Sequence, residues 1–177
     1  MRVRRVVTGH SADGRAVFAS DEEVEPVTTG LMPGTEFHLL WGGDEPPTFP
    51  DDGSRPASST YFPKVGGFRF GWFTLPPAGT DPSADVDIAA ELTRLGEQLP
   101  GLMDHMEPDD PGMHTTDTID FEVVLSGEVV LELDDGAEKV LRTGDTVVQN
   151  GTRHRWHNRS TEPATLAVFI VGAHRTS

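Results

Sequence analysis

Residues that could bind a metal ion recur toward the end of the chain. Alternate positions in one short run are polar: His114, Thr116, Thr118 and Asp120. On an extended strand, alternate residues point to the same face. His154 follows after several turn signals, so the folded chain can return it to the same place. Two imidazoles and a carboxylate form a ligand set that leaves coordination positions open for a substrate. The spacing therefore predicts a metal site at His114, Asp120 and His154.

The predicted donor atoms are nitrogen and oxygen, because the chain contains no Cys. Such a set suits Fe(II) best, and Mn, Ni, Zn and Co also accept it. A second interpretation needs no metal, since these side chains could form a buried hydrogen-bond network with Thr116, Thr118 or a trapped water. We favour the metal because burying several ligand-type side chains on one face costs desolvation free energy unless a cation compensates.

Residues near these ligands are assigned to the cavity when they lie an even number of positions from a ligand on the same predicted strand. The predicted cavity lining is Thr116, Thr118, Glu122 and Trp156. Glu122 shares the parity of the carboxylate ligand, although a cross-strand pair or a bulged edge would also explain a glutamate there. Trp156 is in phase with the second histidine. As a core residue it would be equally unsurprising.

The other polar residues are expected to lie away from the cavity. Opposite parity places Asp117, Arg153, Arg155 and His157 on the outer face, where we expect them to be solvated. Asn158 is expected to hold a turn. The histidines without a partner at ligand spacing are His10, His38, His105 and His174. His105 is the best candidate among them for a further ligand or acid–base group, because it adjoins the predicted helix near the cavity mouth.

Turn residues divide the chain into short segments with strand character. Strands are predicted over 2–7, 15–19, 35–41, 67–75, 119–125, 128–133, 138–141, 146–149, 154–158 and 165–171. Short strands separated by turn signals at this spacing are typical of an antiparallel sandwich or barrel. Residues 42–58 are rich in Gly, Pro, Asp and Ser, and predict a long surface loop that is either mobile or a cover.

One segment has helical periodicity. Between residues 81 and 106, apolar residues recur three or four positions apart, which is the stripe of an amphipathic helix. We predict a helix over 83–99, with Asp81 or Ser83 as its N-cap and Pro100-Gly101 as its end. Its apolar stripe must be buried, so segment 80–113 is expected to cover the cavity mouth.

The run from His114 to Asn158 resembles the two conserved motifs of the cupin superfamily. His114, Asp120 and Gly127 take positions of the first motif, and Gly144, Gly151, His154 and Asn158 follow the second. The resemblance is fair over 68–79 and weak over 1–65. It implies an all-β fold, an antiparallel double-stranded β-helix or jelly-roll barrel with one inserted α-helix. The chain is then one cupin-like domain over 1–177, with a barrel from 66–79 and 114–172 and a helical insertion over 80–113.

The chain also departs from these motifs. Thr116 stands where the family has its second histidine, Asp120 replaces glutamate, and Gln149 replaces proline. One of the four usual protein ligands is therefore missing. Two hypotheses remain open. The first is a metal-dependent enzyme acting on a small organic molecule, as an oxygenase, isomerase, cyclase or decarboxylase. The second is a non-catalytic small-molecule binder that has lost its metal; the family includes both kinds.

Composition limits the partners. The 177 residues include 14 basic and 29 acidic side chains, for a net charge of −15. A field of this sign repels phosphate backbones and anionic lipid, so nucleic acid and membrane surfaces are poor partners. No apolar run has the length of a signal peptide or a membrane span, and we expect a cytoplasmic protein. Strands 3–7 and 35–41 are predicted edges, which favours a homodimer.

Overall fold

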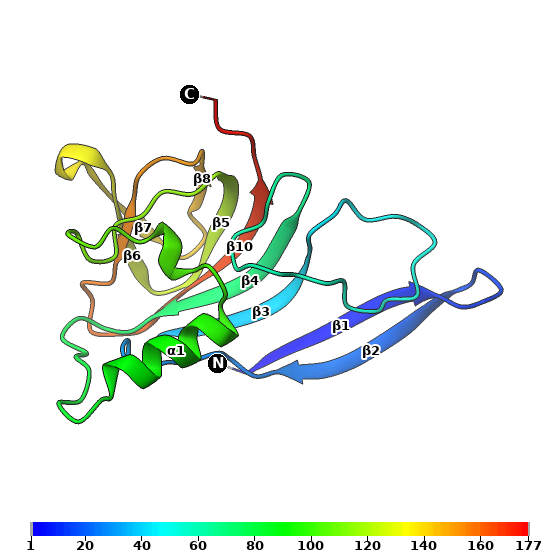
Figure 1. The fold of residues 1–177 in the computed structure, drawn as a ribbon, viewed down its shortest axis with the longest axis horizontal. Helices are drawn as coiled ribbons and strands as arrows, with labels where there is room; N and C mark the ends of the chain where they lie inside the picture. Colours follow the sequence, from blue (N-terminus) through cyan, green and yellow to red (C-terminus); the bar gives the residue numbers. More distant parts are fainter. Residues whose placement is uncertain (1, 177) are drawn as a thin grey trace.

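The computed structural model describes residues 2–176 and is built mainly of antiparallel strands (Figure 1). The strands are β1 (Val3–His10), β2 (Ala16–Val24), β3 (Glu36–Gly43), β4 (Phe68–Leu75), β5 (Thr118–Ser126), β6 (Glu128–Glu132), β7 (Glu138–Arg142), β8 (Thr146–Gln149), β9 (Arg155–His157) and β10 (Ala164–Gly172). The helices are α1 (Ile88–Gln98) and two short 3₁₀ turns, η1 (Met103–His105) and η2 (Asp134–Gly136). Within residues 2–176, none of these helices is long and apolar enough to cross a bilayer.

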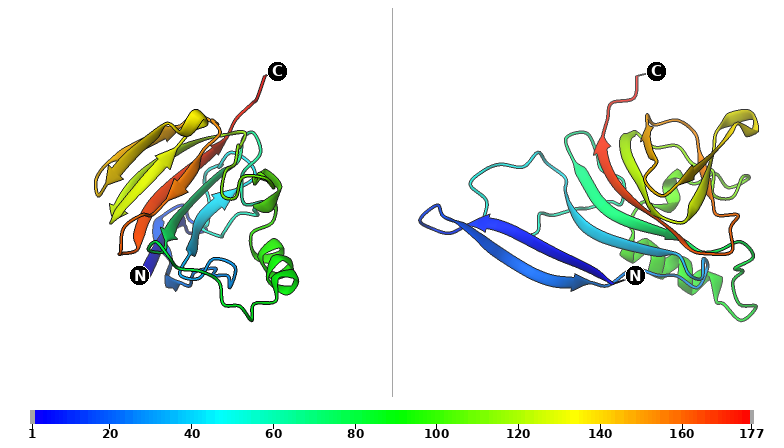
Figure 2. Two further views of the ribbon diagram at one scale, coloured as in Figure 1. Left: turned by 90° about the vertical axis from the view of Figure 1, so that its left-hand side faces the viewer. Right: turned by 180° about the vertical axis from the view of Figure 1, so that it is seen from behind.

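Two sheets form the body of the molecule (Figure 2). The larger sheet has five strands in the order β3-β4-β10-β5-β8, and the smaller has three in the order β7-β6-β9. Neighbouring strands in both sheets are antiparallel. The predicted all-β jelly-roll fold with one α-helix is confirmed. Alternation and turn residues were sufficient to place the strands from β5 to β10, because those turns are short.

Strands β1 and β2 form a separate two-stranded ribbon that projects from the body (Figure 1). The predicted hairpin is present, and both strands are longer than expected. The loop between β3 and β4 crosses back to this ribbon, where the amide of His10 donates to the carbonyl oxygen of Asp51 at 2.7 Å. The predicted long loop is therefore a cover for the ribbon. Strand β3 lies at the edge of its sheet, as predicted for residues 35–41.

Helix α1 begins later than predicted. Neither Asp81 nor Ser83 caps it; the side chain of Asp87 accepts a hydrogen bond from the amide of Ala90 at 3.0 Å. A carboxylate in that position satisfies an amide that would otherwise lack a partner, so the helix starts after Asp87. It ends before Pro100, as expected, because proline disfavours a helical conformation at the preceding residue.

Helix α1 packs through the second half of its apolar stripe. Leu95 and Leu99 are each 1% exposed and lie with Leu102 against Phe37 of β3. Each such leucine stabilises the fold by about 2 kcal/mol. Ile88, at the start of the helix, remains 62% exposed. The apolar contacts of the helix are therefore concentrated at its C-terminal end, which adjoins the cavity.

Candidate functional site

A cavity of about 580 Å³ lies between the inner face of the five-stranded sheet and a covering segment, residues 88–113, that contains α1 and η1. Its walls are mostly apolar. The covering segment contributes Leu95, Leu102, Met103, Met106, Glu107, Pro108, Pro111 and Gly112. The structure thus places the inserted helical segment over the cavity, where the sequence predicts it. Tyr61 and Phe62, from the loop between β3 and β4, complete the wall.

Two histidines face this cavity side by side. His114 and His154 are directly opposite residues of an isolated antiparallel bridge, which puts their side chains on the same face. Their ring centroids lie 4.1 Å apart with an interplanar angle of 49°. His154 is 2% exposed.

Each imidazole is held through its Nδ1 atom. The Nδ1 atoms of His114 and His154 lie 3.0 and 2.9 Å from the carbonyl oxygens of Gly112 and Thr152. A carbonyl only accepts, so Nδ1 carries the proton and Nε2 keeps its lone pair. Burial lowers the pKa of both rings, and that of His154 to about 4, with the neighbouring histidine contributing. Both rings are therefore neutral at pH 7, the state that a metal ligand requires.

Two carboxyl groups of β5 point into the same cavity. Asp120 and Glu122 are paired in register with Ile170 and Val168 of β10, which also line it. Burial raises the pKa of Asp120 to about 6 and that of Glu122 to about 8, where the charge of Asp120 adds to the effect. Within residues 2–176, Oδ1 of Asp120 and Oε2 of Glu122 are buried without a hydrogen-bond partner. Such oxygens are costly, which points to a ligand that would complete them.

Thr116 and Thr118 do not line the cavity, in contrast to the prediction. Their hydroxyl groups hydrogen-bond to each other at 2.8 Å, and the side chain of Thr118 bonds the carboxyl of Asp120. Thr118 keeps the parity of Asp120 within β5, whereas the bend at Asp117 interrupts the alternation before it, at Thr116. Thr118 therefore holds the carboxyl group of Asp120, and Thr116 holds the hydroxyl group of Thr118.

The remaining predicted residues divide between the cavity and its surroundings. Trp156 lines the cavity, with its ring edge-on to that of His154 at 6.4 Å between centroids. His105 is outside the lining; its Nδ1 lies 3.1 Å from the carbonyl oxygen of Thr115, and its ring packs edge-on against Phe62. Hydrogen bonding and packing thus explain His105 without a role as a ligand. Apart from the length of its loop, nothing in the sequence indicates that Phe62 lines the cavity.

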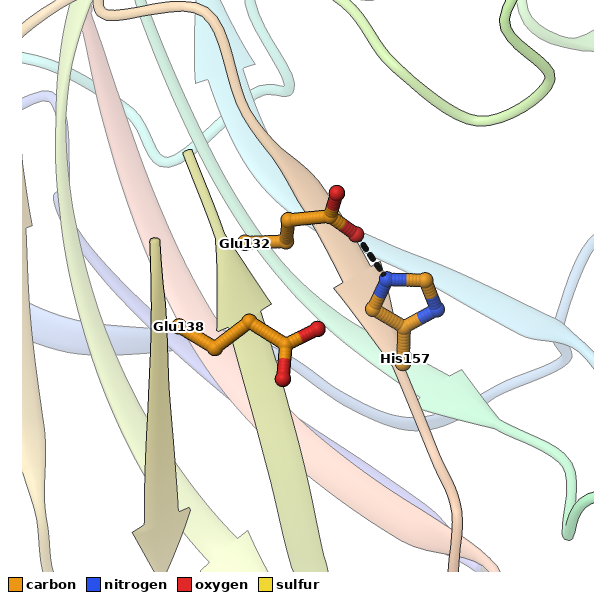
Figure 3. Close-up of side chains that lie close together, drawn as sticks. All are labelled: Glu132, Glu138 and His157. Carbon is orange, nitrogen blue, oxygen red and sulfur yellow. Dashed lines mark hydrogen bonds and ion pairs between the residues drawn. The ribbon is translucent and has the colours of Figure 1, made fainter. Parts of the chain in front are cut away.

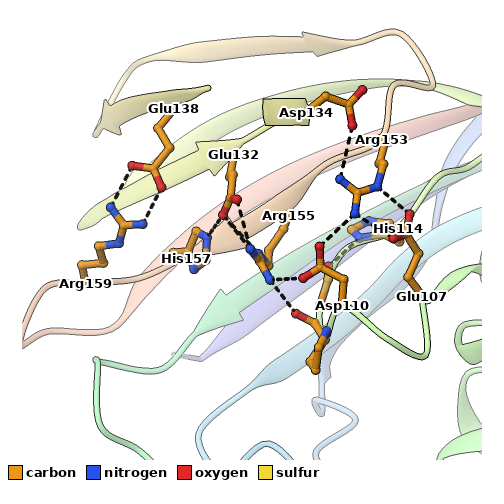
Figure 4. Close-up of polar contacts among 12 residues, drawn as sticks. Glu107, Asp110, His114, Glu132, Asp134, Glu138, Arg153, Arg155, His157 and Arg159 are labelled. Atoms are coloured by element: carbon orange, nitrogen blue, oxygen red, sulfur yellow. Dashed lines mark hydrogen bonds and ion pairs between the residues drawn. The ribbon is translucent and has the colours of Figure 1, made fainter. Parts of the chain in front are cut away.

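A different group has its ligand atoms already close together. Within the described part of the chain, the side chains of Glu132, Glu138 and His157 form the group of three with donor atoms inside 4.8 Å of one another (Figure 3). The three predicted ligands do not form such a group in this conformation. The two carboxylates of this group already form ion pairs with arginines: Glu132 with Arg155, and Glu138 with Arg159 (Figure 4). Glu132 also bonds His157. We therefore interpret it as an ion-pair network.

Arg153 and Arg155 are engaged rather than solvated, which corrects the prediction. Arg153 makes two bonds of 2.7 Å to the carboxylate of Glu107 and one of 2.8 Å to Asp110 (Figure 4). Arg155 binds Asp110 at 2.6 Å and also Glu132. Glu107 and Asp110 belong to the covering segment, so these arginines fasten it to the barrel. Alternation along the strand predicts that both arginines point to the outer face. It does not predict that acidic residues of the insertion reach them there.

Together, the two-sheet fold and the ligand-type side chains in its cavity define a small jelly-roll barrel protein. Residues 103–171 match the family model of the cupin domain. The chain therefore carries a cupin domain over these residues.

Several known proteins are similar. The phomopsin biosynthesis cluster protein C' of Diaporthe leptostromiformis is 29% identical over 168 residues, or 94% of this chain and 76% of that one. The cupin-domain-containing oxidoreductase fogC of Aspergillus ruber is 26% identical over 157 residues, or 89% and 64%. A solved Cupin 2 conserved barrel domain protein from Salinispora arenicola has 15% identity and a TM-score of 0.42, with 86% and 90% covered.

Proposed function

We propose that this cupin is a metal-dependent enzyme that acts on a small, largely apolar organic molecule inside the barrel. The observation that carries this proposal is the meeting of two neutral histidines and two carboxyl groups at one apolar cavity, where oxygens of Asp120 and Glu122 lack partners within residues 2–176. Similarity to cupin-domain-containing oxidoreductases favours redox chemistry over isomerisation or decarboxylation.

The donor set fits a divalent cation. Nε2 of His114, Nε2 of His154 and the carboxylate of Asp120 would hold it, as the sequence predicts, and the carboxyl group of Glu122 would lie nearby. Fe(II) suits nitrogen and oxygen donors of this kind best, while Mn, Ni, Zn and Co also bind them. A bound divalent ion would polarise a substrate oxygen or, as iron, support oxygenase chemistry.

The protein itself would select and shield the substrate. The cavity is of the size that accommodates a small organic ligand. Tyr61, Phe62 and Trp156 offer aromatic surfaces for a flat or apolar molecule, and such contacts add to the free energy of burial. The covering segment excludes water from the polar groups, which strengthens their interaction with a substrate oxygen. The net charge of −15 disfavours anionic substrates.

A non-catalytic binder is the second candidate. One observation favours it: the ligand atoms of His114, Asp120 and His154 are not gathered within 4.8 Å of one another. In that case the unpaired carboxyl oxygens would accept hydrogen bonds from a polar group of the bound molecule.

Metal analysis distinguishes the two candidates. Untagged protein would be equilibrated in turn with Fe(II) without oxygen, Mn(II), Ni(II), Zn(II) and Co(II), and bound metal measured by elemental analysis after dialysis. We expect stoichiometric uptake that His154→Ala abolishes. His157→Ala is the matched control, because it removes a histidine of the ion-pair network, and its uptake should equal that of the parent. Absence of uptake by the unmodified protein would favour the binder. Loss of uptake in His157→Ala but not in His154→Ala would place the metal at Glu132, Glu138 and His157 in the three-stranded sheet.

A further inference from the structure

The outer face of the five-stranded sheet carries an apolar row that crosses every strand. The row consists of Trp41, Phe70, Phe169, Phe121 and Val148, each paired in register with the next. Four of these side chains are well exposed: Phe70 by 40%, Phe169 by 41%, Phe121 by 45% and Val148 by 55%. Their neighbours along β10, Val168 and Ile170, line the cavity, so the row faces the other way.

Neither flanking row adds a charge to this surface. One contains Phe68, Val171 and Ile119. The other contains Trp72, Ala167 and Val123, and His38 of β3, which is paired with Trp72, is buried and has a pKa lowered by that burial. In a chain with 24% charged residues and a net charge of −15, these three adjacent rows carry no acidic side chain. Helix α1 lies on the opposite side of this sheet (Figure 2).

The exposed apolar area matches that of the largest patch on a typical soluble protein, and such patches are often functional. A fully exposed aromatic side chain presents about 150–250 Å², so the central row alone leaves roughly 300 Å² of apolar surface in water. Together with the flanking apolar rows the patch exceeds this area, and larger contiguous patches mark interaction sites. Leaving the row in water costs free energy that a second surface could recover by covering it.

We propose that this face docks against the same face of a second copy of the chain. A two-fold interface requires a surface that is complementary to itself. This row meets the requirement because it is apolar along its whole length. Phe169 lies on β10, the central strand of the sheet. A two-fold axis parallel to β10 would set Phe70 of one copy against Phe121 of the other, and Trp41 against Val148. Because each copy carries a charge of −15, contact through an uncharged face also keeps repulsion lowest.

The β1–β2 ribbon extends from the same edge of the sheet. Arg5 of the ribbon lies over the ring of Trp41, at the end of the row, with 5.6 Å to the ring centroid. An isolated two-stranded ribbon is only marginally stable in water, and this one exposes Val6 by 45% and Phe18 by 80%. A stable interface buries about 800 Å² on each copy, which the central row does not reach alone. The flanking rows and the ribbon would supply the rest.

Sedimentation velocity of the untagged full chain tests this proposal. We expect a dimer at micromolar concentration that tightens with added salt, because salt screens the like charges. Val148→Glu would place two unpaired carboxylates in the interface and weaken dimerisation by at least about tenfold. Val140→Glu is the matched control. Val140 is 46% exposed on β7 of the other sheet, and its substitution should leave the dimer unchanged.

A second, uncharged variant guards against misfolding. Phe70→Thr keeps strand propensity and removes one aromatic contact, so it should also weaken the dimer while the circular dichroism spectrum is retained. The proposal is overturned if the unmodified protein stays monomeric throughout, if Val148→Glu dimerises like the parent, or if Val140→Glu dissociates equally. Metal uptake is measured on the same samples and should not change. Failure of the interface is thereby separated from failure of the metal site.

Discussion

The backbones of His114 and His154 are joined by two hydrogen bonds, with each amide donating to the other residue's carbonyl oxygen at 3.0 and 2.9 Å. Main-chain pairing therefore places the two residues directly opposite each other, and the Nδ1 hydrogen bonds orient their rings. Either ring can be removed while the bridge stays in place. Substitutions at these positions should accordingly report on ligand binding more than on folding.

Thr116→His tests whether the missing motif histidine can be restored. The motif alone would predict tighter metal binding, provided that the new ring reached the ion. In the structure the side chain of Thr116 is 1% exposed, bonded to Thr118 and outside the cavity lining. We expect no gain in metal affinity and a loss of about 1–3 kcal/mol in the free energy of unfolding, because a larger ring must fit a filled space. Isothermal titration and urea denaturation measure the two effects; a clear gain in affinity would contradict the placement of Thr116.

The sequence predicted the later strands well because short turns at Gly127, Gly144 and Gly151 fix their ends. Gly127 and Gly144 have φ values of 77° and 93°, which favour glycine over other residues. The start of α1 was predicted less well, since Asp81 and Ser83 were the expected N-caps and the folded chain uses Asp87 instead.

Long-range contacts account for the rest of the difference. Tyr61 reaches the cavity because its amide donates to the carbonyl oxygen of Pro100 at 2.7 Å, a contact between two segments without a shared pattern. Alternation from His114 to Asp120 assumed one continuous strand, and the bend at Asp117 interrupts it. Periodicity predicts a side chain's face only while the backbone conformation persists.

Glu91 of α1 should make the fold sensitive to acid. Its Oε2 atom accepts bonds from Arg94, from the amide of Gly30 and from the hydroxyl of Thr29, at 2.7, 2.7 and 2.8 Å. These bonds, that from Arg94 above all, lower the pKa of Glu91 to about 2. The folded pKa lies below the unfolded value, so this stabilisation is complete above about pH 4.5 and is lost as the pH falls toward 2. Glu91→Gln should make the free energy of unfolding, measured by urea titration, less dependent on pH over that range. An unchanged pH dependence would exclude this contribution.

His38 should respond to pH in the region near neutrality. Its side chain is 2% exposed, and neither ring nitrogen has a hydrogen-bond partner within residues 2–176. Burial lowers its pKa, although Glu36 and Glu25 act in the opposite direction. The unfolded chain therefore binds a proton that the folded chain resists, and stability should fall as the pH drops below about 6.5. His38→Leu should weaken this dependence without abolishing it, because burial also lowers the pKa of His114 and His154, and it should stabilise the fold by about 1 kcal/mol, since an unpaired buried polar group is removed. A lower melting temperature for His38→Leu at pH 7 would contradict this account.

The ion pairs between Arg153 and the covering segment should control access to the cavity. Arg153→Met keeps much of the side chain's length but removes its bonds to Glu107 and Asp110. We expect residues 103–113 to open more often, because the segment then keeps only one of its two arginine contacts to this sheet, that of Arg155 with Asp110, while the barrel strands stay protected. Hydrogen exchange should then be faster at the amides of Glu107 and Met113, which are bonded within the segment. Iodide or acrylamide should also quench the fluorescence of Trp156 more strongly.

Arg159→Met is the control for this prediction. Arg159 forms a comparable bidentate ion pair with Glu138 on the same sheet, but it does not contact the covering segment. Its removal should leave exchange at residues 103–113 and quenching of Trp156 at the level of the parent protein. Equal acceleration in both variants would indicate that the small sheet loosens as a whole. Unchanged exchange in Arg153→Met would mean that the ion pair between Arg155 and Asp110, together with the apolar contacts of Leu95, Leu99 and Leu102, is enough to hold the cover closed.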